Sequence, residues 1–316
     1  MIDGVAADPS LSVVMVVGEE RERARRAVDA VVTQSIAATI ELVLVDLQPG
    51  LGSLTADDSA ASITLVDRAG ESSWSAARHA GVAAARTPIV AFVEEHVYVE
   101  PGWAEAVVTT YRDHSHAVAV GYAFANARAD RKPDGTLLAE YGRWVEPARG
   151  GRRSALPGNN VSYRRDALLD AAQGAEDAFA IDFTLHAELA RRGSFVVAPG
   201  AVVLHDGFPR LVDTLRANHE YGRALAAARA ARGAWSPARR MAYAAGTPLI
   251  PLLNAVRLGQ TLPGRGLWRG ALRHAPTCVA IWAAAASGEL VGYASLSGAE
   301  GERLLRWEVD VERRPR

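Results

Sequence analysis

Three titratable residues, Glu94, Glu95 and His96, follow the apolar run PIVAFV, which has the composition of a buried strand. Placing such groups at the end of a core strand costs desolvation free energy unless a ligand binds them. Asp46 and Asp67 end two further apolar runs, IELVLVD and ITLVD, in the same way. Because ligands of parallel sheets bind at the carboxyl ends of the strands, we expect these side chains to mark the rim of a ligand crevice.

The elements that must position these groups alternate between strand and helix over the first two thirds of the chain. Apolar, β-branched runs predict strands, and segments with apolar residues at helical spacing predict helices between them. The predicted strands are residues 11–17, 40–46, 63–67 and 88–93, and the predicted helices are 21–34 and 73–86. Such an alternation indicates an α/β fold with a mostly parallel sheet flanked by helices on both faces.

Beyond Trp103 the alternation is less regular. The pattern predicts a strand over 116–125, a Gly- and Arg-rich loop over 126–155 that closes over a site, and a strand edge entering a helix over 158–172. A further helix is predicted over 176–193 and two short strands over 194–206. From Pro209 onward the pattern is helical. We therefore expect an α/β domain over 1–208 and a helical C-terminal region over 209–316.

Composition narrows the class of protein. Lys and Arg number 35 against 36 Asp and Glu, for a formal net charge of −1, which gives no reason to expect nucleic acid as a partner. The single cysteine, Cys278, suits a reducing compartment. The first ten residues, MIDGVAADPS, lack the apolar segment of a signal peptide, so a cytoplasmic protein is expected.

Two apolar stretches lie in the C-terminal region, MAYAAGTPLIPLLNAV and TCVAIWAAAASGELVGYASL. Proline interrupts the first, and Glu289 interrupts the second. Between them lie Trp268 and four arginines, Arg257, Arg265, Arg269 and Arg273. Basic residues and tryptophan beside short apolar helices are typical of a segment on a membrane surface, here residues 240–296 on the inner face of the cell membrane. The alternative is a helical hairpin that packs on the main domain.

Four motifs follow one another along the chain: ESSWSAARHAGVAAARTPIVAFVEEHVYVEPGW, GNNVSYRRDALL, AEDAFAIDFTLHAELARRG and VLHDGFPRLVDTLRANHEYGRA. In this order and spacing they resemble the inverting family 2 glycosyltransferases, over roughly residues 10–230. The resemblance implies the GT-A fold, with the catalytic nucleotide-sugar-binding domain within 1–208. It also implies the transfer of a sugar from a nucleotide-sugar donor to an acceptor hydroxyl, with inversion at the anomeric carbon.

The resemblance implies a metal site as well. Members of the family carry an Asp-x-Asp motif at the end of the fourth strand, where this chain has Glu94-Glu95-His96. Because side chains alternate along a strand, Glu94 and His96 are expected on the metal side, with Glu95 nearer the nucleotide ribose or a structural arginine. A carboxylate with an imidazole favours Mn²⁺ over Mg²⁺. His205 is a further ligand by resemblance or a hydrogen-bonded rim histidine, and the alternative for the cluster is a solvated strand end without a metal.

Further roles come from the same resemblance. Asp177 would be the base that accepts the acceptor proton, with Glu176 as the second candidate, although acidic residues also suit an ordinary first helical turn. Arg78 and Asp46 would bind the donor nucleotide, unless Arg78 is a surface residue. The turn amides, Asn159 and Asn160, would bind acceptor hydroxyls or serve only the turn.

Departures from the family pattern bear on substrate and mechanism. Asp46-Leu47 stands where the family has two adjacent aspartates that touch the base, so the donor base stays open. The Gln-x-x-Arg-Trp motif of processive synthases is missing, which favours single transfer, with a cell-envelope or lipid-linked glycan as the hypothetical acceptor. A nucleotide-dependent oxidoreductase is disfavoured because no Gly-rich turn follows the first strand. A catalytically degenerate nucleotide- or sugar-binding scaffold stays the alternative function, and the oligomeric state is open.

Overall fold

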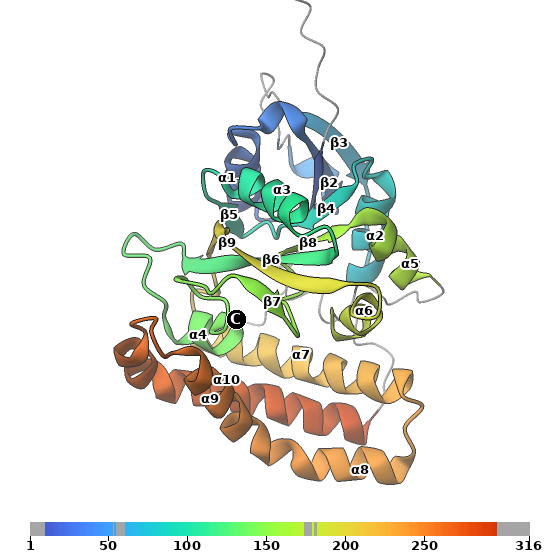
Figure 1. Cartoon of the computed structure of the whole chain (residues 1–316). Helices are drawn as coiled ribbons and strands as arrows, with labels where there is room; N and C mark the ends of the chain where they lie inside the picture. The colour runs from blue at the N-terminus through green and yellow to red at the C-terminus, as the bar shows by residue number, and fades with distance from the viewer. Residues whose placement is uncertain (1–9, 53, 55–60, 174–178, 180–181, 296–316) are drawn as a thin grey trace, which may run out of the picture.

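The computed structural model describes residues 10–52, 54, 61–173, 179 and 182–295. Within them the strands form one sheet in the order β3-β2-β1-β4-β8-β6-β9-β5, with β7 paired to β9 (Figure 1). The strand bounds are β1 Leu11–Val17, β2 Ile40–Asp46, β3 Ser62–Asp67, β4 Ile89–Phe92, β5 Val97–Val99, β6 Ala117–Asn126, β7 Gly151–Arg153, β8 Val161–Arg164 and β9 Ser194–His205. Strands β3, β2, β1 and β4 are parallel, whereas β8 runs antiparallel to both β4 and β6.

Strands β1 and β2 are buried along their whole length, because apolar side chains leave both faces of the sheet. Leu11, Val13 and Met15 face helices α1 Arg21–Val32 and α3 Trp103–Asp113, whereas Val14 and Val16 face the opposite side. That side is covered by α2 Trp74–Ala84, α5 Arg165–Ala172 and α6 Asp182–Leu189. The predicted α/β fold with helices on both faces is therefore confirmed.

The structure differs from the sequence-based expectation in several places, one of which is helix α3, where no element was predicted. The expected loop 126–155 contains a helix, α4 Gly135–Tyr141, and strand β7. The two short strands expected over 194–206 form one strand, β9, whose register with β6 is irregular where Pro199 and Gly200 bulge outward. Strand β5 was not expected at all, because its three residues are too few to show a pattern. Two short helices, η1 Ala37–Thr39 and η2 Pro49–Leu51, lie before and after β2.

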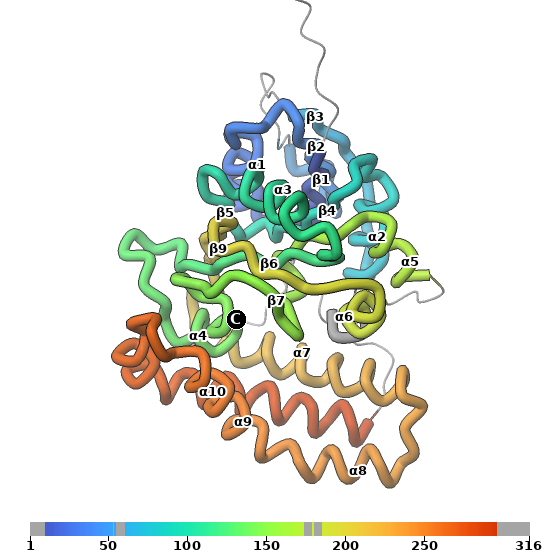
Figure 2. The backbone as a smooth tube through the Cα atoms, in the orientation of Figure 1, coloured from blue at the N-terminus to red at the C-terminus, as the bar shows by residue number. Residues whose placement is uncertain are grey.

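The C-terminal region consists of α7 Leu211–Arg232, α8 Pro237–Gly246, η3 Thr247–Leu249, α9 Ile250–Thr261 and α10 Trp268–Ala294. These helices form a layer on the side of the molecule away from β1–β3 (Figure 1). Helix α10 lies along α7 (Figure 2) and also packs on α4, where Cys278 Sγ is 3.4 Å from the Gly135 carbonyl and Trp282 Nε1 donates to the Ala139 carbonyl at 3.0 Å. The described chain is helical here as expected, and the division at residue 208 stays a prediction.

Buried Arg265 fixes the loop before α10 to the α/β region. Its guanidinium donates to the carbonyls of Gly142 and Pro147 at 2.9 and 3.0 Å, and also to the Val145 carbonyl. Burial lowers the pKa of Arg265, and several carbonyl acceptors compensate part of that desolvation. Arg265, one of the arginines expected at a membrane surface, is therefore buried and joins the loop before α10 to the segment after α4.

Small residues set the distance between α7 and α10. A side chain at Gly222 would overlap the Ala285 carbonyl, and side chains at Gly288 and Gly292 would overlap the carbonyls of His219 and Arg223. The two helix backbones therefore touch directly along this line, and no larger residue fits without separating them.

We predict that Gly288→Ala lowers the free energy of unfolding by about 1–3 kcal/mol, because the added methyl group has to displace the backbone of α7. Gly270→Ala in the same helix is the matched control, since a Cβ there meets nothing within 4 Å and alanine favours helix. Urea unfolding followed by circular dichroism would measure both. Equal stability of the two variants would contradict the close α7–α10 contact.

Candidate active site

Three potential metal ligands converge from two parts of the sheet. Glu94 follows β4, His96 precedes β5, and His205 ends β9. Strand β5 pairs antiparallel with β9 so that Val97 lies opposite His205, which places His96 beside it. One ligand atom from each of the three residues lies within 4.8 Å of the others. The structure thus brings together the set expected from the sequence, and this Glu/His/His group could hold a metal ion.

Glu94 is held in a fixed orientation by Asn160. The Asn160 side-chain amide donates to Glu94 Oε2 at 2.6 Å, and its oxygen accepts from the Glu94 backbone N–H at 3.1 Å. Both residues are buried, and Glu94 Oε2 lies 3.6 Å from His96 Nε2. The amide therefore orients the carboxylate toward His96 and stabilises its charge in a desolvated place.

Glu95 points the other way, toward the segment after β1. Its carboxylate accepts from the Gly18 backbone N–H at 2.8 Å and from Arg23 Nη2 at 2.9 Å. Burial raises the pKa of Glu95, and the Arg23 charge opposes that shift. The structure thus gives Glu95 the arginine partner that was one of its two expected roles, and contact with the nucleotide ribose stays a prediction.

The alternation of side chains along a strand, which was expected to separate Glu95 from Glu94 and His96, is wrong as the reason for this divergence. Strand β4 ends at Phe92, so Glu94, Glu95 and His96 lie in a turn and not on a strand with alternating faces. Glu95 diverges because Gly18 and Arg23 bind it, whereas Glu94 is turned by Asn160.

His205 is an uncharged imidazole at neutral pH. Its surroundings are aromatic: the ring centroid lies 5.0 Å from that of His96, edge to face, and 4.9 Å from that of Tyr141. Burial lowers the pKa of His205 to about 4. A neutral imidazole has a free nitrogen lone pair, which is the form that binds metals.

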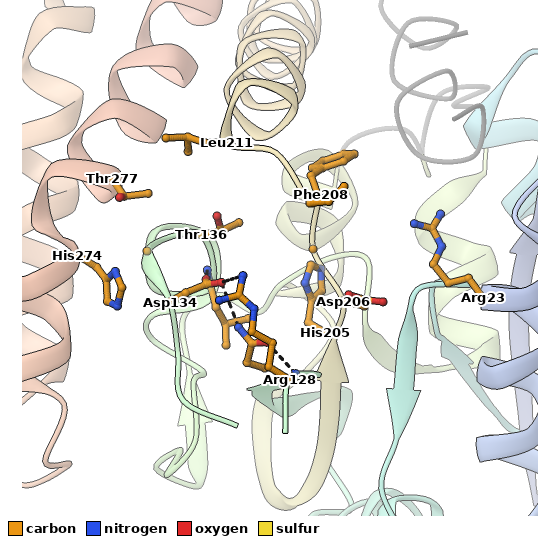
Figure 3. A pocket seen from close by; sticks show the side chains of 15 residues that line it. Arg23, Arg128, Asp134, Thr136, His205, Asp206, Phe208, Leu211, His274 and Thr277 are labelled. Carbon is orange, nitrogen blue, oxygen red and sulfur yellow. Dashed lines mark hydrogen bonds and ion pairs between the residues drawn. The ribbon is translucent and has the colours of Figure 1, made fainter. Parts of the chain in front are cut away.

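Two cavities meet at His205. The larger, of about 1410 Å³, is lined by Glu94, His96, His205 and Asn159 and extends to α7, α8 and α9. The smaller, of about 700 Å³, lies between the end of β9, α4 and α10 (Figure 3). Arg23, His205 and Asp206 line both cavities.

The predicted donor-binding residues have protein partners. Asp46 forms an ion pair with Arg21 at 2.8 Å and accepts from the Gln48 backbone N–H. Arg78 is buried in α2, where its guanidinium lies over the rings of Trp74 and Phe92 and donates to Asn159 Oδ1 at 2.9 Å. The surface alternative for Arg78 is therefore wrong.

The remaining predicted roles have not been tested. Donor binding by Asp46 and Arg78 stays a prediction, as does acceptor binding by Asn159 and Asn160. Asp177 and Glu176, the predicted bases, lie outside the described residues.

Two residues of the site were missed in the sequence. Arg23 lies among several arginines at the start of α1, and nothing in its spacing distinguishes it. Asp206 directly follows His205; its carboxylate accepts from the Tyr98 hydroxyl at 3.2 Å, and its backbone N–H donates to the His96 carbonyl at 3.0 Å. Burial and the nearby Asp206 charge raise the pKa of Tyr98 to about 12. The pair His205-Asp206 at a strand end was the available signal.

Comparison with known proteins fits this geometry. The family described as "Glycosyl transferase family 2" matches residues 12–168, which include β1 to β8 and the turn with Glu94 and His96. No curated protein matches the chain. Among solved structures, GalNAc-T7 with UDP, GalNAc and Mn²⁺ is 14% identical, with a TM-score of 0.47 over 64% of this chain and 45% of that one. S. aureus TarS 1-349 is 12% identical, with a TM-score of 0.45 over 69% of this chain and 64% of that one.

The chain thus spans less than two thirds of the length of either solved structure. The family match, on a sheet with a polar cluster at its strand ends, defines a glycosyltransferase domain of the GT-A type. Residues 12–168 thus belong to glycosyl transferase family 2.

We predict that Asn160→Asp destabilises the fold by about 1–3 kcal/mol, because Glu94 loses its donor and faces a second buried carboxylate. Asn159→Asp, at the neighbouring position, is the control: the Asn159 side-chain oxygen accepts from Arg78, so a carboxylate at this position keeps that hydrogen bond. Chemical unfolding at pH 7 would compare them. If the two aspartate variants are equally stable, Asn160 does not hold the Glu94 carboxylate.

Proposed function

We propose that this protein is an inverting, metal-dependent glycosyltransferase that moves one sugar from a nucleotide-sugar donor to an acceptor hydroxyl. The observation that carries the proposal is the convergence of Glu94, His96 and His205 within 4.8 Å on the wall of a large cavity, in a family 2 domain. The donor set fits a cation: one carboxylate and two imidazoles suit Mn²⁺ better than Mg²⁺. A divalent cation at this place would neutralise charge that develops on the departing diphosphate.

The residues around the cluster prepare it for this task. Asn160 keeps the Glu94 carboxylate pointing at His96, and the low pKa of His205 keeps its imidazole neutral. Arg23 lines the same cavity, and its buried Nε has no hydrogen-bond partner in the described structure. We therefore assign Arg23 a place beside the donor diphosphate, with its Nη2 bound to Glu95.

Inversion requires direct displacement at the anomeric carbon by the acceptor oxygen, with a base to take its proton. Asp177 holds the family position for that base, with Glu176 next to it. The acceptor would enter through the part of the cavity lined by Leu225, Tyr243 and Leu253, whose apolar character favours a lipid-linked or cell-envelope glycan.

We predict that His96→Ala lowers Mn²⁺-dependent hydrolysis of the donor by about 100-fold or more, whereas Glu95→Gln keeps it within about tenfold. The reason is that His96 faces the cluster, whereas Glu95 binds Gly18 and Arg23. A thermal-shift panel of UDP-, GDP-, CDP- and dTDP-sugars with Mn²⁺ identifies the donor first. Hydrolysis is then measured against the Mn²⁺ concentration.

Two outcomes would contradict this proposal. Equal losses of Mn²⁺-dependent hydrolysis in the His96 and Glu95 variants would contradict the assignment of His96, and not Glu95, to the metal ion. Absence of any effect of Mn²⁺ on nucleotide binding and on turnover in the wild type would favour the alternative, a non-catalytic nucleotide- or sugar-binding scaffold.

We predict that Asp177→Asn retains donor binding but slows transfer about 10²–10⁴-fold, since an amide cannot accept the proton. Glu176→Gln serves as the matched control at the neighbouring position. Donor affinity from calorimetry and transfer rate under single-turnover conditions separate the two effects. If Asp177→Asn transfers at the wild-type rate while Glu176→Gln does not, the base is Glu176.

A further inference from the structure

Helix α9 presents apolar side chains that the fold leaves uncovered. Leu249 at the end of η3 and Leu252, Leu253 and Val256 in α9 recur at i, i+3, i+4 and i+7, and their exposed fractions are 59%, 62%, 50% and 51%. Among the residues of α9, only Leu258 is buried. A helix that packs on its own domain places such a stripe inward, whereas this one directs it to the surface.

The neighbouring helices add to this surface. Met241 and Tyr243 of α8 and Trp268 and Leu272 of α10 are also exposed, Leu272 by 71%. Exposed apolar residues gathered on adjacent helices mark an interaction surface, since isolated ones are ordinary and clustered ones are not. We call the exposed residues of α8, η3, α9 and the first turns of α10 the apolar-basic surface.

The charges of this segment have one sign. Residues 236–295 contain six arginines and a single carboxylate, Glu289, and that carboxylate is buried and paired with Arg229 at 3.0 Å. Arg239, Arg257, Arg269 and Arg273 are exposed. A second copy of the chain would place arginines against arginines, whereas an anionic lipid surface would meet both the arginines and the apolar stripe.

Among the described residues, helix α10 is long and apolar enough to cross a membrane by length and composition. In the structure 44% of its most apolar stretch is buried, and Cys278 and Trp282 bind the backbone of α4. If α10 lies on the membrane interface, its contacts with α4 are preserved, whereas an α10 that spans the bilayer would lose them.

We propose that the apolar-basic surface binds the surface of a membrane that contains anionic lipids. Tyr243, Ile250, Leu253 and Arg257 belong to α8 and α9 and also line the large cavity, so the cavity reaches this surface. Resting on the proposed transfer function, this arrangement would let an acceptor held in the bilayer enter the cavity toward Glu94.

Flotation of the full chain with phosphatidylcholine vesicles, with and without about one third phosphatidylglycerol, tests the proposal. We expect binding to the anionic vesicles that weakens at high salt. Leu252→Glu with Val256→Glu should reduce binding at least about 30-fold, since both apolar side chains leave the interface. Arg257→Gln should reduce it about fivefold. Leu65→Glu, at a 64% exposed leucine on β3, is the control and should bind as the wild type does.

Several results would overturn the proposal: no binding to anionic vesicles, equal binding by the double variant and the wild type, or an equal loss in Leu65→Glu. Concentration-dependent dimerisation by light scattering that the double variant abolishes would assign the surface to a second copy instead. Because the vesicles contain no donor or acceptor, failure here leaves the proposed transfer intact, and loss of Mn²⁺-dependent turnover would leave membrane binding intact.

Discussion

The site depends on one constraint: beyond the end of a core strand Glu94 and Glu95 are buried and His96 is half-buried, and each of these groups needs its own compensation. Asn160, from the turn before β8, binds Glu94. Gly18 and Arg23, from the segment after β1, bind Glu95. The β5–β9 pairing brings His205 to His96. Four segments distant in sequence are thus fixed by the cost of desolvating these groups, and the same contacts leave Glu94 and the two histidines directed at one point.

Much of the fold could be predicted from the sequence because its signals are local. Strands β1 and β2 are continuous apolar runs, and α1 and α2 show helical spacing between them. The errors arise where structure depends on distant partners. Helix α4 has only seven residues and is stabilised by packing on α10, more than a hundred residues later in the chain. The local signal for this helix is limited to its N-cap, Asp134, whose side chain accepts from the Leu137 backbone N–H.

The candidate site shows the same division. Residue type and the family resemblance predicted Glu94, His96 and His205 as one group, and the structure brings them together. The alternation expected to separate Glu95 from Glu94 and His96 is absent, since β4 ends at Phe92. The separation comes from Gly18, Arg23 and Asn160, which lie at least 66 residues from their partners. Arg23 had no distinguishing signal among the arginines of α1, so its place at the cavity could be found only from the folded chain.

The C-terminal helices complete the cavity and are not a detached appendage. Arg265 joins them to the segment after α4, and the cavity that begins at the cluster ends on α8 and α9. The end of the cavity with Glu94 and His96 is therefore built largely by residues inside the 12–168 match, with His205 added from β9, whereas the opposite end is built by residues outside that match. Variation in these helices would change what enters the cavity without altering the cluster.

The position of Cys278 has a chemical consequence. The only thiol of the chain is buried between α10 and α4, and burial raises its pKa to about 11. Thiolate is the reactive form, so alkylating reagents and peroxide encounter an inert group as long as the two helices stay together. The speed of its modification therefore reports how often this helix pair separates, a natural probe that requires no introduced label.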